Sequence, residues 1–278
     1  MTILVTGATG NVGRNVVEML LAEGAPVRAT SRVPETSGLP AEADVRAADL
    51  TRPETLADAL SGVDKVYLFP EPETVGAFVE LAQGAGVRHV VLLSSLSAKE
   101  PGAESDAIGR RHVLVERALE ASTMDWTFVR PGAFAANTLQ WAKSIREEGV
   151  VRAPYANANI APVHEKDIAA VAVRALLDDG HAKKAYELTG PESLTQLRQV
   201  ELIAEAVGRP VRFDELTPEQ TREQMSRWVP QGVVDSLLGY LAEAEQRTAE
   251  IFDITEKITG RRARTFADWA ADHVDDFR

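Results

Sequence analysis

The sequence predicts an α/β protein in which a doubly wound parallel sheet is followed by a smaller, mainly helical C-terminal part. Three observations support this fold class. Short β-branched segments alternate with helical patterns through the first half, a glycine-rich turn follows the first of these segments, and amphipathic helical patterns dominate the last third. Strands that alternate with helices at this spacing form right-handed βαβ units, whose parallel sheet is covered by helices on both faces.

Six segments of the first half have the composition of strands, at residues 2–6, 26–30, 44–47, 65–69, 89–94 and 126–130. The intervening segments place apolar residues at i, i+3, i+4 and i+7, a pattern typical of helices that cover a sheet. These predicted helices lie at residues 11–24, 52–62, 73–86 and 109–122.

The pattern loosens after residue 130. Residues 131–149 are expected to form a loop and a helix, residues 160–164 a further strand, and residues 165–179 a helix capped by Asp167. Amphipathic helices are predicted at 195–208, 218–228, 232–252 and 265–277, with short strands at 186–188 and 211–213. We therefore expect residues 1–132, continued by about 160–190, to form the larger domain, and residues 133–159 with 191–278 to form the smaller one.

Composition excludes several classes of function. The 278 residues contain 30 Lys and Arg against 42 Asp and Glu, a net charge of −12, and no cysteine. A negative field disfavours nucleic acid and anionic membranes as partners, and the lack of thiols removes disulfides, thiolate metal sites and cysteine nucleophiles. No secretory signal precedes the first strand, so we expect a cytoplasmic protein that acts on a small molecule. Oligomeric state leaves no signal in the sequence.

The most informative segment runs from Val5 to Gly13, directly after the first predicted strand. Gly7 permits a tight turn, Gly10 allows backbone N–H groups to approach a pyrophosphate, and Gly13 lets the helix pack close to the sheet. A helix N-terminus then faces the anion with unpaired donors. The spacing is GxxGxxG, and it predicts dinucleotide contacts from Gly7, Thr9, Gly10, Asn11, Val12 and Gly13.

The residues after the second strand indicate which dinucleotide is bound. An acidic residue there would bind the ribose 2′-hydroxyl of NAD, but this chain has Ser31 and Arg32. A guanidinium can pair with a 2′-phosphate, which favours NADP(H) over NAD(H), although a solvated surface arginine is the alternative. Asp49 and Leu50 are expected near the adenine, with Asp49 as a helix cap as the alternative. The other strand ends expected at the cofactor carry Phe69, Pro70, Ser94 and Pro131.

These motifs resemble those of the NmrA-like group of atypical short-chain dehydrogenase/reductases. The resemblance covers nearly the whole chain and rests on TGATGNVG at residues 6–13, Arg32, Asp49-Leu50, LLSS at 92–95, VRPGAF at 129–134 and the tail from Ile258 to His273. It implies an NADP-binding Rossmann domain and a smaller domain that closes over a cleft. The group includes quinone reductases, other reductases, isomerases and redox-sensing regulators, so membership alone does not select the activity.

This chain departs from the superfamily at its catalytic pair. Short-chain dehydrogenases usually carry YxxxK, in which the tyrosine transfers a proton and the lysine lowers its pKa. None of the four tyrosines is followed by such a lysine, and alignment of the 109–122 helix puts Ile108 at the tyrosine and His112 at the lysine position. His112 is a candidate ribose ligand or proton donor; the alternative is a structural histidine bonded to Glu116 or to the backbone.

The remaining candidates surround the expected substrate. Ser95 resembles the superfamily's substrate-orienting serine, although serine is also a common turn-former at strand ends. Phe134, Asn137 and Trp141 are expected to face the cleft, with core packing as the alternative. A metal site is not expected, because the five histidines are scattered.

Three functions follow as hypotheses. The first is an NADPH-dependent oxidoreductase that reduces a small quinone, enone or carbonyl compound. The second, motivated by Ile108, is a cofactor-sensing regulatory protein that binds a partner. The third is an isomerase or epimerase that retains its cofactor.

Overall fold

The computed structural model describes all 278 residues and contains one seven-stranded parallel sheet with the strand order β3-β2-β1-β4-β5-β6-β9. Its strands are β1 (Ile3–Val5), β2 (Val27–Ser31), β3 (Asp44–Ala47), β4 (Lys65–Leu68), β5 (His89–Leu93), β6 (Asp125–Pro131) and β9 (Lys184–Leu188). The chain runs outward from β1 to β3, then returns to β4 and continues the other way. This is the doubly wound topology that the sequence predicts.

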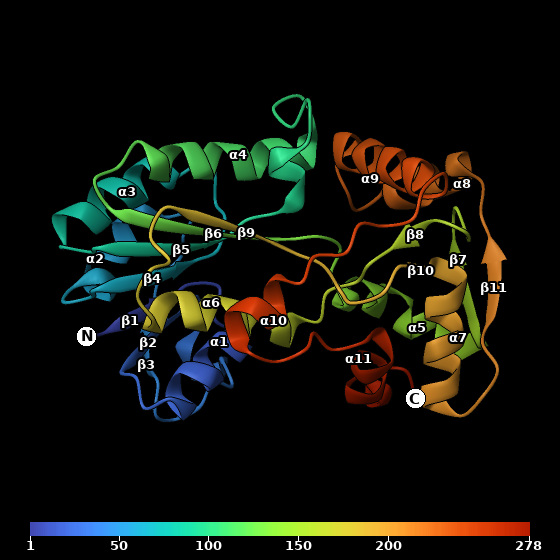
Figure 1. The fold of residues 1–278 in the computed structure, drawn as a ribbon, viewed down its shortest axis with the longest axis horizontal. Helices are drawn as coiled ribbons and strands as arrows, with labels where there is room; N and C mark the ends of the chain where they lie inside the picture. Colours follow the sequence, from blue (N-terminus) through green and yellow to red (C-terminus); the bar gives the residue numbers. More distant parts are fainter.

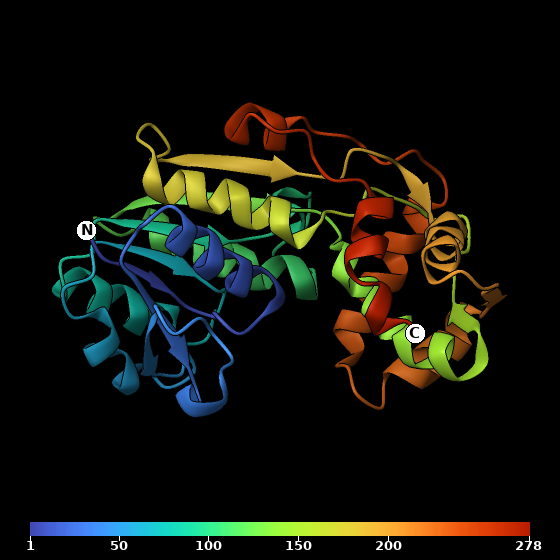
Figure 2. The ribbon, with the colours of Figure 1, turned by 90° about the horizontal axis from the view of Figure 1, so that it is seen from below.

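Helices cover both faces of the sheet (Figures 1 and 2). One face carries α1 (Asn11–Ala22) and α6 (Glu165–Leu177), which share an apolar core with β1 and β2. The other face carries α2 (Leu56–Leu60), α3 (Val75–Gly84) and α4 (Ala107–Glu120), which bury Phe78, Val115 and Leu119 against β4, β5 and β6. The β5 strand has all five residues buried, as expected for a parallel strand between two helical layers.

The smaller elements gather beyond the carboxyl edge of the sheet, at the right of Figure 1. They include the 3₁₀ helix η4 (Ala135–Trp141), α5 (Ala142–Glu148), β7 (Val150–Ala153), β8 (Asn159–Ile160), β10 (Leu194–Thr195), α7 (Gln196–Val207), β11 (Arg212–Glu215), α8 (Pro218–Met225), α9 (Gln231–Ala244) and α11 (Phe266–Asp272). A core of their own, which includes Trp141, Ile203 and Trp269, holds most of them together. The domain boundaries given above remain predictions.

Several details of the second half correct the sequence-based expectations. The strand expected at 160–164 is only the two-residue β8, with a single bridge between Val163 and Phe134. The helix expected at 232–252 ends at Ala244, and a separate helix, α10 (Ile254–Thr259), packs against α6 instead. Residues 184–188 extend the main sheet as β9, which the short predicted strand did not indicate.

The cap of α6 was also wrongly predicted. His164 is the N-cap residue, because its Nδ1 accepts a hydrogen bond from the Lys166 amide. Asp167 lies in the first turn of the helix, where its buried carboxylate is paired with the Arg264 guanidinium and accepts a 2.6 Å hydrogen bond from the Arg264 amide. Asp167 therefore ties the segment before α11 to α6, rather than starting the helix.

The junction of α6 and α11 contains a buried acid–base cluster. The Glu165 carboxylate accepts hydrogen bonds from Trp269 Nε1 at 3.0 Å and His273 Nε2 at 2.7 Å, and His164 Nδ1 lies 3.4 Å from it. Burial alone would raise the pKa of Glu165, but the two neighbouring imidazoles hold it well below its usual range. Glu165 and Asp276 raise the pKa of His273 against the effect of burial.

These shifts predict that the junction loses stability as the solution becomes alkaline. The raised pKa of His273 stabilises the fold fully below about 6.5 and ceases to do so as pH rises through the folded-state pKa; the lowered pKa of Glu165 stabilises it above about 4.5. The melting temperature of wild type should therefore exceed that of His273→Gln most at about pH 5 to 6, and by less at pH 9. A difference between the two proteins that is the same at every pH would contradict this account.

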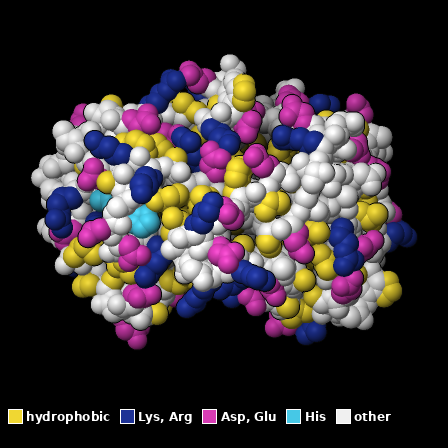
Figure 3. All heavy atoms as spheres, viewed as in Figure 1, with side chains coloured by type: hydrophobic (Ala, Val, Ile, Leu, Met, Phe, Trp, Pro, Cys, Tyr) yellow, Lys and Arg dark blue, Asp and Glu magenta, His cyan; other side chains and the backbone are white.

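Charged side chains are interspersed over the face of the molecule in Figure 3, where acidic and basic groups alternate. None of the helices combines the length and the apolar character needed to cross a membrane.

Candidate functional site

The site lies at the carboxyl edge of the sheet, where all seven parallel strands end. The strand order reverses between β1 and β4, so the segments that follow these two strands flank the switch point. Thr6 joins them: its hydroxyl donates to the Tyr67 carbonyl and accepts from the Phe69 amide at 2.8 Å. Phe69 itself is 43 % exposed and packs against Gly7, where an added Cβ would lie 3.0 Å from the Phe69 Cβ.

The glycine turn has the geometry expected of a pyrophosphate site. Gly7 has φ +59°, and a Cβ on Gly13 would lie 2.2 Å from the Gly7 carbonyl oxygen, so both positions require glycine. Gly10 is the N-cap of α1 and supplies no side chain to bond the first amides of the helix. Thr9, Gly10 and Asn11 are exposed there. A helix N-terminus with free, accessible N–H donors fits the diphosphate of a dinucleotide.

The ends of β2 and β3 place a cation beside a carboxylate. Arg32 is exposed and makes no hydrogen bond with the protein, whereas the Ser31 hydroxyl accepts one from the Val33 amide. Hydrogen bonds from Thr51 lower the pKa of Asp49, and the nearby Arg32 charge contributes to the same effect. The alternative role of Asp49 as a helix cap is wrong, because its carboxylate bonds to Thr51 two residues on.

The other predicted strand-end residues occupy the same edge. Leu50 is half-buried and its carbonyl accepts a 2.6 Å hydrogen bond from Thr74, which fixes the loop after β3. Pro70 and Pro131 are buried behind the edge, after β4 and at the end of β6. These residues therefore lie along one edge of the sheet, as its parallel topology requires.

A buried ion pair supports the edge beneath β5 and β6. Glu116 on α4 accepts hydrogen bonds from Arg130 Nε at 2.8 Å and Nη2 at 2.6 Å, and from the Ser94 hydroxyl at 2.5 Å. The Glu116 side chain is only 7 % exposed. The Ser94 hydroxyl is thus already committed, so a cofactor contact from Ser94 would use its backbone. Sequence reasoning assigned no role to this cluster, because Glu116 and Arg130 look like ordinary helix and strand charges.

His112 lies on α4, and one of its two ring nitrogens has no hydrogen-bond partner. Its Nδ1 is buried without a hydrogen bond, so the alternative of a structural histidine bonded to Glu116 is wrong; Glu116 bonds to Arg130 and Ser94 instead. Burial lowers the pKa of His112 to about 4. A neutral imidazole with an unpartnered nitrogen can bond to a hydroxyl of a ligand, but it carries no proton to donate as an imidazolium near neutral pH.

Ser95 follows β5 as the N-cap of the 3₁₀ helix η3 (Leu96–Lys99). Its Oγ accepts hydrogen bonds from the Ser97 amide at 3.2 Å and the Ser97 hydroxyl at 2.9 Å. This is the turn-forming role given above as the alternative, and the hydroxyl keeps its own proton for one further partner.

A cavity of about 680 Å³ opens beyond the end of β6. Phe134, Asn137 and Trp141 all line it. Asn137 and Trp141 lie on the 3₁₀ helix η4 rather than on an α-helix, and Phe134 is its N-cap residue. Trp141 is 6 % exposed and also belongs to the apolar core of the smaller part. The opposite wall comes from segments that sequence reasoning did not connect to the site, with Gln196, Gln199, Leu216, Thr221, Gln224, Met225, Leu237, Tyr240 and Leu241.

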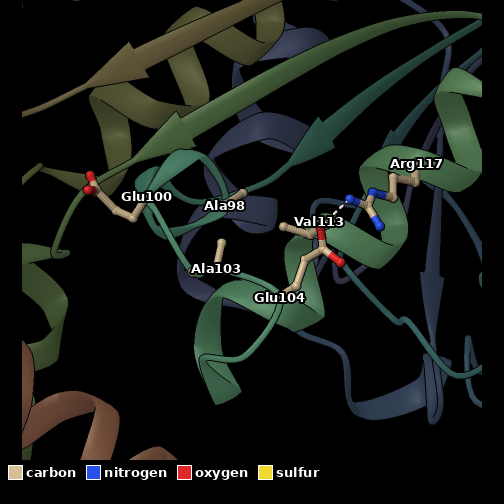
Figure 4. Close-up of a pocket in the computed structure, with 7 residues that line it drawn as sticks. Ala98, Glu100, Ala103, Glu104, Val113 and Arg117 are labelled. Carbon is tan, nitrogen blue, oxygen red and sulfur yellow. Dashed lines mark hydrogen bonds and ion pairs between the residues drawn. The ribbon is translucent and has the colours of Figure 1, made fainter.

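A second, smaller pocket of about 210 Å³ lies between the η3–α4 loop and α4 (Figure 4). Its cation, Arg117, is paired with Glu104 across the mouth, and Ala98, Ala103 and Val113 form the apolar part. With its cation neutralised, this pocket lacks the donors that a dinucleotide requires.

The fold and the glycine turn define the class: a Rossmann-type dinucleotide-binding protein that has a separate cavity beyond the sheet edge. The family model described as NAD(P)H-binding matches residues 7–179. The chain therefore belongs to the NAD(P)H-binding family, and its resemblance to the NmrA-like group is confirmed.

Relatives and solved structures agree with this assignment. The chain is 43 % identical to the (4-alkanoyl-5-oxo-2,5-dihydrofuran-3-yl)methyl phosphate reductase of Streptomyces griseus, over 99 % of both chains. It is 36 % identical to the NAD(P)H azoreductase of Xenophilus azovorans, over 98 % of both. The NADPH-dependent quinone oxidoreductase of Escherichia coli superposes with a TM-score of 0.81 at 26 % identity, covering 97 % of this chain and 98 % of its own. The chain is an NAD(P)H-dependent oxidoreductase.

Proposed function

We propose that this protein is an NADPH-dependent reductase of small, uncharged quinone, enone or carbonyl compounds. The observation that carries the proposal is the 680 Å³ cavity, which begins at Ala133 and Phe134, directly after the strand that ends at Pro131. A substrate in this chamber would approach the edge of the sheet at which such folds bind the reactive end of their cofactor.

The proposed cofactor contacts follow the strand ends from β1 to β6. They comprise Gly7, Thr9, Gly10, Asn11, Val12, Gly13, Ser31, Arg32, Asp49, Leu50, Phe69, Pro70, Ser94, His112 and Pro131. The bound nicotinamide would supply the hydride, and the protein orients the two ligands and excludes water. His112 acts in this scheme as a hydrogen-bonding group for a ribose hydroxyl, because Glu116 is already bonded to Arg130 and Ser94 and does not engage the imidazole.

We propose NADPH as the preferred cofactor because Arg32 is exposed and unpaired at the end of β2. Arg32→Glu should weaken NADPH binding by at least about tenfold, since it removes a cation from the 2′-phosphate and adds a like charge. NADH binding should change by much less. Fluorescence titration of both cofactors measures this, with Arg52→Glu as a matched control, because Arg52 already pairs with Glu54. Equal losses for NADPH and NADH in Arg32→Glu would contradict the assignment.

The lining of the cavity favours an uncharged substrate. Arg152 is its one charged side chain, and it pairs with Glu148 through bonds of 3.2 and 2.5 Å. The 43 %-identical relative is named for a phosphate ester and the 36 %-identical one for azo compounds. Because no free cation faces the chamber, we infer a neutral compound with a conjugated oxygen.

The test is NADPH oxidation at 340 nm with 2-methyl-1,4-naphthoquinone and with 1,4-naphthoquinone-2-sulfonate. We expect turnover with the neutral quinone and a clearly lower kcat/KM with the anionic one. NADPH consumption that does not rise above background with quinones, enones or aldehydes would overturn the proposal. In that case a cofactor-dependent partner complex would support the sensing function, and bound cofactor that is never consumed would support an isomerase.

A further inference from the structure

The helix α9 presents one face to the cofactor half of the molecule. Gly232, Ser236 and Tyr240 are spaced four residues apart and therefore lie along one stripe of α9. A Cβ on Gly232 would lie 3.4 Å from the Ala107 Cβ, at the start of α4. The Ser236 hydroxyl donates to the Gly232 carbonyl at 2.9 Å, and Ser236 helps to lower the pKa of Asp106, the N-cap residue of α4, against the effect of burial. Figure 1 shows α9 beside the first turn of α4. This first turn carries Ile108, the position at which the superfamily has its tyrosine.

Tyr240 lies where this stripe meets the cavity. Tyr240, Leu237 and Leu241 all line the chamber, and Tyr240 keeps 38 % of its surface exposed, so a ligand can reach it. Its hydroxyl makes no hydrogen bond to the protein.

The other hydroxyls of the cavity are not free to donate. Thr138 donates to the Ala135 carbonyl at 2.7 Å, Ser144 to Trp141 at 3.0 Å and Thr221 to Thr217 at 3.1 Å. Each of these protons is held by the side chain's own helix. Tyr240 therefore supplies the hydroxyl proton that the chamber can offer to a ligand.

The remaining tyrosines cannot take this role. Tyr67 is buried in the core of the sheet, with 1 % of its surface exposed. Tyr186 bonds to His181 Nδ1 at 2.6 Å, at the opposite edge of the sheet. Tyr155 packs on the small apolar cluster of Ala158 and Leu241 and does not line the chamber.

Two charged side chains act on the Tyr240 phenol. Burial raises the pKa of the Tyr240 phenol; the Arg247 charge opposes this effect and the Glu100 charge adds to it. Glu100 directly follows η3, in the loop that starts at the end of β5. The phenol is therefore protonated at neutral pH.

We propose that Tyr240, on α9, donates a hydrogen bond from its hydroxyl to the carbonyl or quinone oxygen of the substrate and so orients the substrate. Ile108, at the position of the superfamily's tyrosine, has no hydroxyl and cannot make this bond. This inference rests on the proposed reductase function and identifies the residue that would recognise the oxygen. Tyr240 remains a hydrogen-bond donor throughout, and the proton taken up by the product comes from solvent.

Tyr240→Phe tests the inference, because it removes the hydroxyl and keeps the ring. With NADPH and 2-methyl-1,4-naphthoquinone, kcat/KM should fall about five- to tenfold. The dissociation constant of the quinone, measured through quenching of tryptophan fluorescence, should rise in the same direction. NADPH affinity and the melting temperature should stay unchanged, which a merely structural role would not predict. Tyr155→Phe is the matched control and should behave as wild type.

The outcomes separate this inference from the proposed function. If wild type turns over the quinone and Tyr240→Phe matches it in kcat/KM and quinone affinity, the inference is overturned and the reductase function stands. If wild type binds the quinone without turnover, weaker binding by Tyr240→Phe supports the inference while the reductase function fails. A wild type that neither binds nor reduces the quinone overturns both the inference and the proposed function. An equal loss in Tyr155→Phe overturns the inference alone.

Discussion

Glu116→Ala is expected to lower the free energy of unfolding by about 3 to 5 kcal/mol. The substitution leaves the Arg130 guanidinium, whose side chain is 18 % exposed, without its carboxylate, and it removes the acceptor of the Ser94 hydroxyl. An uncompensated charge in a buried position costs far more than the pair contributes. Urea denaturation followed by circular dichroism measures the loss.

Two further variants make this result specific. Glu148→Ala breaks an ion pair of similar geometry with Arg152, but its partners are 49 % and 38 % exposed, so the loss should stay below about 1 kcal/mol. The double variant Glu116→Leu with Arg130→Leu should recover much of the stability, because it leaves no buried charge. A Glu116→Ala protein as stable as Glu148→Ala would show that the buried pair does not support the edge of the sheet.

Gly13→Ala and Gly10→Ala should separate the fold from cofactor binding. An added Cβ at residue 13 would lie 2.2 Å from the Gly7 carbonyl oxygen and 2.8 Å from its carbon, so the backbone must shift. We expect a loss of at least about 2 kcal/mol in stability. At residue 10 the added Cβ meets only the Gly7 carbonyl oxygen at 3.3 Å, and the backbone is extended, so stability should change by less than about 1 kcal/mol.

Gly10→Ala should weaken cofactor binding although it changes stability less than Gly13→Ala does. The methyl group of Gly10→Ala occupies the space above the exposed amides, and NADPH affinity should fall at least about tenfold in a fully folded protein. Gly76→Ala is the control, because nothing lies within 4 Å of a Cβ there. Thermal melting without ligand and fluorescence titration with NADPH measure the two effects. A Gly10→Ala protein with wild-type NADPH affinity would exclude this turn as the pyrophosphate site.

The sheet could be predicted from sequence because its signals are local. Each strand from β1 to β6 lies in a short segment that alternates with a helical pattern, and the glycine turn after β1 indicates both the topology and the ligand class. Ends of strands differ from the prediction by one or two residues, as at β1 and β4. The positions of Arg32 and Phe69 at the edge followed directly from this regular alternation.

The second half resisted prediction because its signals are tertiary. Asp167 looked like a cap, but it is recruited by Arg264, which lies 97 residues away. His112 could be placed on the correct helix from its periodicity, yet only packing shows that Nδ1 has no partner. The far wall of the cavity, with Thr221, Leu237 and Tyr240, joins segments that share no motif with Phe134.

The glycine turn and one side of the cavity come from different parts of the chain, and this has an evolutionary consequence. The glycine turn proposed to receive the cofactor lies within the first 13 residues, whereas α8 and α9, which line one side of the cavity, span Pro218 to Ala244. If the proposed site is right, mutations in α8 and α9 would change which compound is accepted without altering the turn proposed to hold the reductant. On the same proposal, a lineage would keep one coenzyme and exchange substrates by varying a stretch of fewer than about thirty residues.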